Sequence, residues 1–541
     1  MLPILFLLAA ASGAQPEGEA DLLIVNARIH VSARAKPVAA LAVKNGRVLA
    51  AGDEALRRAG PSTRRLDLGG AAVFPSFIDS HAHMRGLGAL LESRDLRHAA
   101  SIAEIAAYVR ERASAVPKGE WIVARNWDQT NWGGAFPSAR DLDAAAPDHP
   151  VFLSRVDGHA AWVNSRALAV AGVTKDTPDP PGGKIVRDAE GNPAGVLIDR
   201  AMNLVRSRIP PPSFEQIKRQ LALAAAECAR LGLAGVHDAG VAAEDLRAYR
   251  ELQAEGRLPV RIYAMIGGDG PLWRQYLERG PETGPWLTVR AIKLYADGAL
   301  GSRGAAMWQP YSDDKGNTGL LITPREEIER IARQAVARGF QVCTHAIGDR
   351  ANRVVLDAYA AVLGGPNDKR FRIEHAQVVS LPDFRLFKEF GVIPAIQATH
   401  ATSDMRWAEA RLGPDRVAGA YAWKRFLQLG IPVANGSDFP VEEPDPLAGF
   451  YASVTRQDRE GRPPGGWMPD QKMTREEALE SWTISAAYAA FEEKIRGTLE
   501  PGKYADFVVL DRDIMTVPGM EILRTKVKMH FVDGRPVYQS K

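Results

Sequence analysis

Short apolar segments and amphipathic segments alternate through the middle of the chain. One amphipathic stretch, residues 324–339, has the apolar spacing of a helix and ends in Gly339, which suits a helix C-cap. The apolar segment that follows it has the length of a buried strand. Eight such segments are expected to be strands: residues 71–80, 233–240, 260–267, 289–297, 340–348, 371–379, 391–399 and 431–439.

Eight buried strands alternating with helices predict an α/β fold, a (β/α)₈ TIM-type barrel. About 150 residues separate the first two strands, which predicts a large insertion after the first strand, at residues 85–230 of a barrel spanning 71–490. Both ends of the chain are rich in short strands, and Asn45-Gly46 is a hairpin signal. Residues 20–70 and 491–541 are therefore expected to form one small β-sandwich domain.

Composition narrows the function classes only slightly. The 541 residues are 46% hydrophobic and 25% charged, which is typical of a globular protein. The 68 basic and 65 acidic residues give a net charge of +3, which does not favour binding to nucleic acid or to an anionic membrane. Two cysteines do not make a disulfide framework.

The N-terminal end differs from the rest. Residues 2–14 are apolar and end in small residues, so residues 1–14 are expected to be an export signal, with a mature protein that is periplasmic or secreted. No Lys or Arg precedes the apolar run, and a short apolar arm on a cytoplasmic protein is the alternative.

Polar residues with metal-binding chemistry follow several of the predicted strands. Functional groups gather at the C-terminal ends of barrel strands, so residues distant in sequence are expected to meet there. A single polar residue of this kind is weak evidence for a metal site, because a histidine that ends a strand is more often structural and an aspartate often caps the next helix. Together, imidazoles and a carboxylate suit zinc or a similar divalent ion. The candidates are His81, His83, Lys293, His345, His375 and Asp438.

The sequence that contains these candidates resembles the amidohydrolase superfamily, and within it the YtcJ-like branch that includes N-substituted formamide deformylase. The resemblance covers nearly the whole chain after residue 14. It rests on "FPSFIDSHAH", "WDQTNW", "RVDGHAAWVNSRAL", "GVHDAG", "IKLYADGALGSRGAA", "THAIGD", "RIEHAQ", "GSDFPVE" and "GTLEPGKYADFVVLD".

The resemblance implies a role for each candidate ligand. His81 and His83 would hold the more buried metal ion, and His345 and His375 a second. Lys293 would carry a CO₂-derived carbamate that bridges the two ions. Asp438 would bind metal and act as the catalytic residue that handles the proton of the attacking water. Metal number varies in this superfamily, so one or two ions, zinc first, remain open.

Further residues are candidates for substrate binding. Trp127, Asp128, Arg155 and His159 lie in the expected insertion, where ordinary packing is an equal alternative. Asp297 and Arg303 follow the lysine strand on a Gly-rich loop, where a structural salt bridge explains them almost as well. His400 follows the seventh strand and is expected to contact substrate. His237, at the end of the second strand, would support the metal ligands from behind.

The sequence thus predicts a metal-dependent hydrolase that cleaves a non-peptide, amide-like C–N bond of a small molecule with metal-activated water. The same centre could instead open a lactone or ester or deaminate a ring. A non-catalytic binding protein is less favoured because every expected ligand is present. A Ser or Cys hydrolase lacks a nucleophile motif. Neither nucleic acid nor a stable membrane anchor is expected as a partner, and homodimer formation is left open.

Overall fold

The computed structural model describes residues 18–156, 158, 160–180 and 183–541. The expected export signal at residues 1–14 and the candidate His159 lie outside the described residues. Two compact units divide the chain. The first comprises residues up to 83, 225–438 and 442–541, and the second comprises residues 84–224 and 439–441. The second unit therefore ends before residue 230, where the sequence placed the end of the insertion.

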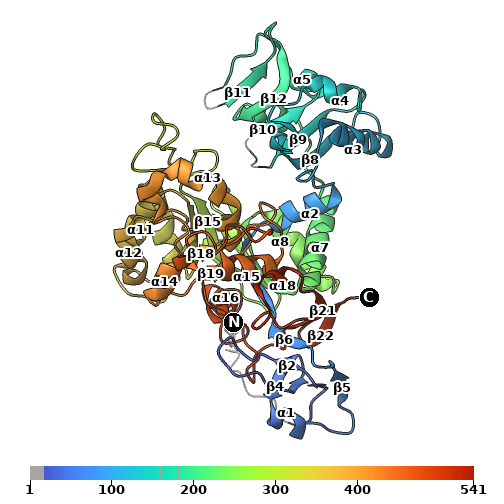
Figure 1. Cartoon of the computed structure of the whole chain (residues 1–541), viewed down its shortest axis with the longest axis vertical. Helices are drawn as coiled ribbons and strands as arrows, with labels where there is room; N and C mark the ends of the chain where they lie inside the picture. Colours follow the sequence, from blue (N-terminus) through green and yellow to red (C-terminus); the bar gives the residue numbers. More distant parts are fainter. Residues whose placement is uncertain (1–17, 157, 159, 181–182) are drawn as a thin grey trace, which may run out of the picture. The chain divides into compact units, whose positions relative to one another are not determined.

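The first unit contains the predicted barrel (Figure 1). Its eight strands are hydrogen-bonded in sequence order and all neighbours run parallel. The strands are β7 (Phe77–Ala82), β13 (Leu233–Val241), β14 (Arg261–Gly267), β15 (Leu287–Tyr295), β16 (Gln341–Ala346), β17 (Arg372–His375), β18 (Ile393–Ile396) and β19 (Ala434–Asn435). The TIM-type barrel is confirmed, although its eighth strand has only two residues.

The first and last strands meet and bring the two ends of the sheet together. The backbone N–H of Asp438 donates to the carbonyl of His81 at 2.8 Å. This approach requires Gly436, because a Cβ at that position would lie 2.6 Å from the backbone nitrogen of His81. The residues that follow β7 and β19 are thereby held side by side.

Amphipathic helices cover the barrel strands. In α10 (Arg325–Ala337) the residues Ile328, Ile331 and Ala335 are buried at helical spacing, which explains the predicted helix. The other helices of this unit lie between or after the strands. They are α8 (Ala243–Ala254), α9 (Leu272–Arg279), α11 (Asp349–Leu363), α12 (Phe384–Glu389), α13 (Ala398–Val417), α14 (Lys424–Gln428), α15 (Pro446–Thr455), α16 (Arg475–Ser481), α17 (Ile484–Ala489) and α18 (Gly519–Leu523), with the 3₁₀ turns η2 (Leu381–Asp383) and η3 (Pro469–Gln471).

Residues from both chain ends form two further sheets that share one core. The first sheet contains only N-terminal strands, and in the second β6 pairs with β20. Asn45 and Gly46 both have positive φ, 50° and 73°, in the turn that joins β3 to β4, as the hairpin signal requires. The core combines Leu22, Val43 and other N-terminal residues with Phe507 and Phe531. The sheets are β4 (Arg47–Ala51), β3 (Leu41–Lys44), β1 (Leu22–Val25) and β5 (Arg64–Asp67), and β2 (Arg28–Ile29), β6 (Ala72–Pro75), β20 (Phe507–Leu510), β21 (Val527–Val532) and β22 (Arg535–Gln539); the short helix α1 (Asp53–Arg57) follows β4.

The second unit is built on its own five-stranded sheet, with apolar clusters on both faces. Successive residues of a strand point to opposite faces, so Val151 and Leu153 enter one cluster and Phe152 the other. The strand order is β11 (Gly183–Arg187), β12 (Pro193–Asp199), β10 (Ala160–Val163), β9 (Val151–Arg155) and β8 (Ile122–Trp127). The helices are α2 (Met84–Glu92), α3 (Ile102–Ala115), η1 (Gln129–Trp132), α4 (Ala139–Asp143), α5 (Ser165–Ala171) and α6 (Met202–Arg206), and α7 (Phe214–Arg230) leads back to the barrel.

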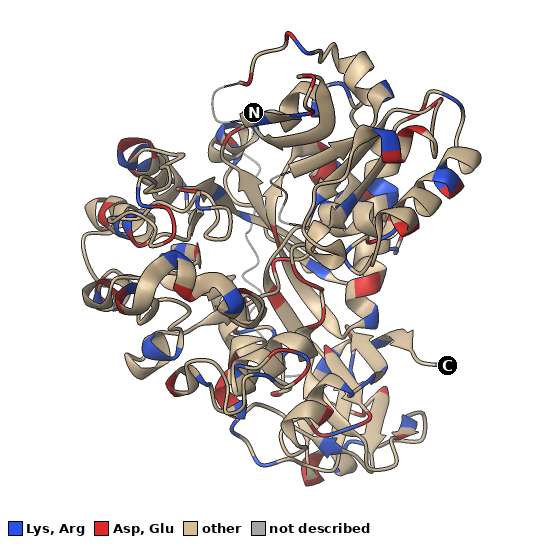
Figure 2. Ribbon diagram, turned by 45° about the horizontal axis from the view of Figure 1, so that its top comes forward, with Lys and Arg blue, Asp and Glu red and all other residues tan. Residues whose placement is uncertain are grey.

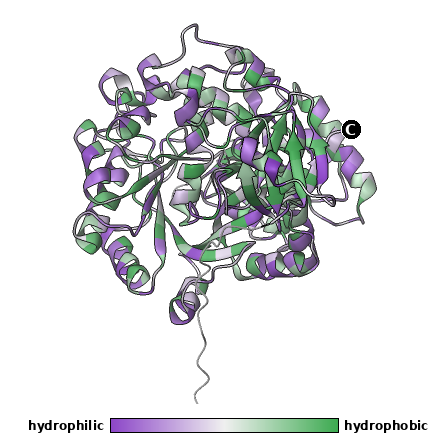
Figure 3. Ribbon diagram, turned by 90° about the horizontal axis from the view of Figure 1, so that it is seen from below, coloured by the Kyte–Doolittle hydropathy of each residue, from purple (hydrophilic) through white to green (hydrophobic). Residues whose placement is uncertain are grey.

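Charge and hydropathy follow this architecture. Blue and red segments lie interspersed along the helices, in keeping with the near-balanced net charge (Figure 2). Strands are mainly green and helices carry both colours (Figure 3), as expected for buried strands under amphipathic helices. None of the helices in the described part of the chain is both long and apolar enough to cross a membrane.

Candidate metal centre

The end of β7 positions two imidazoles whose tautomers are fixed by their neighbours. His81 is fully buried, and its Nδ1–H donates to the carboxylate of Glu374. The Nδ1–H of His83 donates to the carbonyl of Ala239, 2.9 Å away. Because each ring uses Nδ1 as a donor, each Nε2 is an acceptor with a lone pair. Two adjacent Nε2 atoms are therefore available as ligands.

Both Nε2 atoms face the carboxylate of Asp438. Oδ1 of Asp438 lies 3.2 Å from Nε2 of His83 and 3.6 Å from Nε2 of His81. Burial and the nearby charge of Lys293 lower the pKa of His81 well below its usual value, which keeps that ring neutral. Nε2 of His81, Nε2 of His83 and the Asp438 carboxylate thus form one candidate metal-binding group. Two ligand atoms that are each about 2.1 Å from a tetrahedral zinc ion are about 3.4 Å apart, close to the separations found here.

Two more histidines extend this cluster. His345 follows in β16, and His375 ends β17, with 4.5 Å between their ring centroids. The Nδ1–H of His375 donates to Oε1 of Gln397 at 2.7 Å, so its Nε2 is also free. Burial lowers the pKa of His345 to about 3. Nε2 of His345 lies 3.4 Å from the carbonyl of Gly298. Both rings are thus held in the neutral form.

His400, near the start of α13, lies beside His375 and Asp438. It is buried, and among the described residues its Nε2 has no hydrogen-bond partner. That nitrogen lies 3.9 Å from Oδ2 of Asp438, and the His375 and His400 rings are stacked 6.0 Å apart. His400 is therefore placed to contact either a metal ion or a bound molecule.

Lys293 reaches the same centre from β15. It is 1% exposed, and its Nζ lies 3.3 Å from Nε2 of His81 and 4.6 Å from the ring centroid of Tyr295. Burial lowers the pKa of this ammonium. A buried amine with a lowered pKa is more readily deprotonated than a surface lysine, as carbamate formation requires. Among the described residues, two groups are close enough to share a metal ion, His81 with His83 and Asp438, and His375 with His400 and Asp438. Lys293 and His345 border these groups through His81 and His375.

A buried charge network supports His81 from behind. Glu374 is fully buried and faces the guanidinium of Arg372, whose Nη2–H donates to Oε2 at 2.9 Å. Nε of Arg372 lies 2.8 Å from Oε1 at an angle unsuited to a hydrogen bond. Nη1–H of Arg372 donates to Nδ1 of His237 at 2.9 Å. His237 is therefore linked to His81 through Arg372 and Glu374.

Two aspartates organise the backbone around the cluster. Asp79 accepts hydrogen bonds from the hydroxyl and backbone N–H of Ser437, and so ties β7 to the residues after β19. Asp297 accepts three backbone hydrogen bonds, from Ala306, Ile347 and Gly348. Burial raises the pKa of each carboxyl to about 7. Asp297, expected to bind substrate, thus holds its loop in place and lies 3.5 Å from Nε2 of His345.

The structure does not bring Arg303 into the cluster. Its guanidinium forms an ion pair with Asp313 at 2.9 Å, and Arg411 also pairs with that carboxylate. Arg303 has a positive φ of 60° in the loop between β15 and α10. These contacts correspond to the salt-bridge alternative that the sequence left open.

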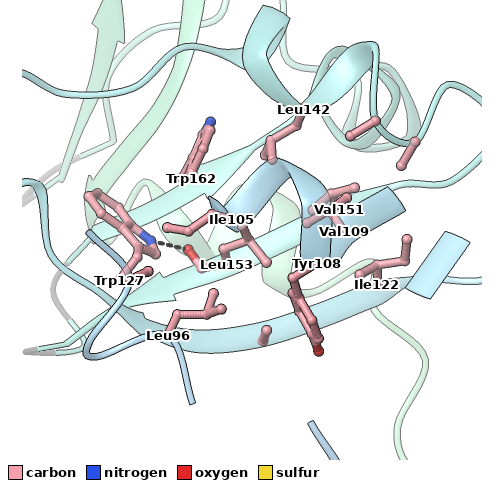
Figure 4. Packing of buried hydrophobic residues seen from close by; sticks show 14 of the residues in the cluster. Leu96, Ile105, Tyr108, Val109, Ile122, Trp127, Leu142, Val151, Leu153 and Trp162 are labelled. Atoms are coloured by element: carbon pink, nitrogen blue, oxygen red, sulfur yellow. Dashed lines mark hydrogen bonds between the residues drawn. The ribbon is translucent and has the colours of Figure 1, made fainter. Parts of the chain in front are cut away.

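The candidates in the second unit form a local group of their own. Trp127 is fully buried in the apolar cluster of Figure 4, and its Nε1–H donates to the carbonyl of Leu153 at 2.7 Å. Asp128 caps the turn η1 and accepts a hydrogen bond from Arg155 at 2.9 Å. With no exposed surface, Trp127 fits the packing alternative, whereas Asp128 and Arg155 are partly exposed.

Three residues of the site were not found from the sequence. Glu374 orients His81, Gln397 orients His375, and Tyr295 lies over Lys293. A signal for Tyr295 was available, because residues i and i+2 of a strand share a face and Lys293 had already been placed at the centre. Glu374 stands in the strand segment that carries His375, whereas the segment of Gln397 carries no metal-binding candidate.

A (β/α)₈ barrel with converging imidazoles and a carboxylate at the C-terminal ends of its strands defines a metal-dependent hydrolase. Comparison with known proteins agrees. The sequence pattern of the Amidohydrolase family matches residues 64–538, and the chain belongs to this family.

Several relatives cover nearly the whole chain. The YtcJ protein of Bacillus subtilis (strain 168) is 34% identical, over 88% of this chain and 91% of its own length. N-substituted formamide deformylase of Arthrobacter pascens is 30% identical, over 95% of this chain and 97% of its own length. The crystal structure of an uncharacterized metal-dependent hydrolase from Pyrococcus furiosus superposes with a TM-score of 0.76 at 31% identity, over 92% of this chain and 100% of that one. The resemblance to the YtcJ-like branch is confirmed.

Proposed function

We propose that this protein hydrolyses a non-peptide C–N bond of the amide or formamide type in a small molecule. The observation that carries the proposal is the convergence of Nε2 of His81 and Nε2 of His83 on the Asp438 carboxylate. Similarity to N-substituted formamide deformylase supports the choice of bond. In that case, the substrate is a neutral amide whose carbonyl carbon is open to attack by water.

His81, His83 and Asp438 would hold one divalent ion, zinc first, and His345 and His375 a second. Lys293, as a carbamate, would supply the anion between them. A bound divalent ion supplies hydroxide at neutral pH by lowering the pKa of its water to about 7, and it polarises a carbonyl. Glu374 and Gln397 fix the ring orientations of His81 and His375.

Asp438 would be the proton-transfer group. The hydrogen bond from its N–H to the carbonyl of His81 holds its backbone, and Oδ1 of its carboxylate lies 3.2 Å from Nε2 of His83. It can therefore accept the proton of the attacking water and deliver it to the departing amine. Proton transfer of this kind contributes about 10²- to 10⁴-fold to a rate.

Elemental analysis of protein purified without chelator tests the centre first. Two equivalents of metal support the bridged arrangement, and one equivalent supports a single-ion hydrolase in which Lys293 is not a ligand. None, after incubation with zinc and bicarbonate, would refute the centre.

A substrate panel then tests the bond. N-alkyl and N-aryl formamides, the matched acetamides, a γ-lactone and an aryl ester are offered to the zinc-loaded protein, with Asp438→Asn as the inactive control. Turnover of formamides or acetamides in preference to the lactone and the ester supports the proposal. The reverse preference would transfer it to C–O hydrolysis on the same centre.

A further inference from the structure

Tyr295 is an exposed aromatic residue at the edge of the cluster. It ends β15 two residues after Lys293, so both side chains point to the same face of the strand. Its ring lies 4.6 Å from Nζ of Lys293 and 5.8 Å from the ring of His345. Tyr295 is 36% exposed, whereas Lys293 is 1% exposed. The tyrosine therefore forms part of the open side of a centre whose other side chains are largely buried.

The phenol hydroxyl has a defined place over the end of β13. A Cβ on Gly240 would lie 3.3 Å from Oη of Tyr295, so the hydroxyl reaches from β15 across the end of β14. The neighbouring carbonyl, that of Ala239, accepts the Nδ1–H of His83. The tyrosine hydroxyl and the partly exposed His83 thus stand over adjacent residues of one strand end. The backbone of Tyr295 is held by Oγ1 of Thr323, which donates to its carbonyl at 2.6 Å.

The hydroxyl makes no hydrogen bond within the described residues, although the polar side chains of the cluster around it are mostly paired. A phenol O–H beside a reaction centre is a donor that suits a carbonyl or carboxylate oxygen. We infer that Tyr295 is a substrate-binding residue whose hydroxyl donates a hydrogen bond to an oxygen of the substrate next to the bond that is cleaved. The inference rests on the proposed function and adds a requirement, namely that the substrate presents an acceptor oxygen toward β13.

A purely structural role for Tyr295 would require its aromatic ring but not its hydroxyl. The ring contact with Lys293 uses the face of the aromatic ring, and phenylalanine offers the same face. Only the hydrogen bond depends on the hydroxyl. Tyr295→Phe therefore separates the two roles, and Tyr538→Phe, in β22 of the terminal sheet, is the matched control for loss of a tyrosine hydroxyl.

The experiment has two readouts on zinc-loaded protein. The first is binding of acetohydroxamate, a small ligand with a carbonyl oxygen, measured by calorimetry without any turnover. The second is kcat/KM on the fastest substrate of the amide panel. We expect Tyr295→Phe to keep the metal content of the wild type, to bind acetohydroxamate about tenfold more weakly and to lose at least about tenfold in kcat/KM. Tyr538→Phe should match the wild type in all three.

The outcomes distinguish this inference from the proposed function. Wild-type probe affinity and kcat/KM in Tyr295→Phe would overturn the hydrogen bond and leave Tyr295 a packing residue. A wild-type protein that does not bind acetohydroxamate would also overturn it. If no amide is turned over but Tyr295→Phe still loses probe affinity, the choice of bond fails and the role of Tyr295 stands.

Discussion

Replacing Glu374 by glutamine tests whether the buried network behind His81 sets its tautomer. Glu374 accepts from Nδ1–H of His81 and from Nη2–H of Arg372 with the same oxygen, Oε2. Glutamine has one oxygen and one NH₂ group. If the oxygen faces Arg372 and His81, the NH₂ group takes the place of Oε1 beside Nε of Arg372, which is also a donor. If the amide is flipped, its NH₂ group meets the N–H groups of both Arg372 and His81, and His81 relieves the clash by moving its proton to Nε2.

Both arrangements have a calculable cost. Removing one partner of a buried ion pair destabilises a protein by about 3–5 kcal/mol, and Arg372 and Glu374 are both fully buried. Loss of the group that orients a metal-binding histidine lowers metal affinity by about 10- to 100-fold. Glu374→Gln should therefore lose about 3–5 kcal/mol in the free energy of unfolding and about 10- to 100-fold in zinc affinity.

Asp506→Asn is the matched control. Asp506 forms a similarly buried ion pair with Arg261, with 2.9 Å between Nε of Arg261 and Oδ2 of Asp506. Arg261 is the first residue of β14, so this ion pair lies at the end of the barrel opposite to the candidate metal centre. It should lose a similar amount of unfolding free energy and keep the wild-type zinc affinity. Chemical denaturation of the metal-free proteins measures the first quantity, and competition with a chromophoric chelator measures the second.

The comparison can fail in two ways. Equal zinc affinity in Glu374→Gln and the wild type would show that His81 needs no partner at Nδ1, and the tautomer argument would be wrong. An equal loss of zinc affinity in Asp506→Asn would show that affinity merely follows stability.

Three further predictions concern other parts of the chain. His83→Ala should lose at least one bound zinc with little change in the thermal midpoint of the metal-free protein, since its side chain is one-third exposed, and the exposed His98→Ala is its control in both measurements. Trp127→Ala should cost about 3–5 kcal/mol of unfolding free energy while zinc content stays unchanged; a selective rise in KM without that loss would restore its substrate role. Burial lowers the pKa of His530 to about 4 from the ordinary 6.5, so protons favour the unfolded chain, and stability should fall by about 3 kcal/mol between pH 6.5 and pH 4. His530→Asn should lack that component, and an identical pH dependence in denaturation experiments would contradict it.

The barrel could be predicted because it depends on local pattern. Each strand is a short apolar run before a polar residue, and the helices between them have their own periodicity. The candidate ligands could be found for the same reason, as they stand where those runs end. Their convergence followed from the barrel, which brings the ends of all eight strands to one side.

Glu374 could not be found in this way, because alternation fails where it stands. Neighbouring strand residues should face opposite sides, so Glu374 and His375 should not both reach the centre. His375 has a φ of 73°, which turns the chain at the end of β17 and lets both side chains contact the cluster. Asp79 is a different case, since its partner Ser437 is 358 residues away and only the closed barrel brings them together. The sequence left two roles open for Trp127, because it does not show whether a tryptophan is buried, and the structure buries this side chain fully.

The contact between His81 and the backbone of Asp438 has a consequence for the synthesis and folding of the chain. The first ligands leave the ribosome early, but the carboxylate that completes their group follows more than three hundred and fifty residues later, and β20, which pairs with β6, follows later still. An incomplete chain therefore carries histidines without their carboxylate. If Asp438 has the proposed role, a chain truncated anywhere before the last barrel strand is expected to be inactive, because it lacks this carboxylate.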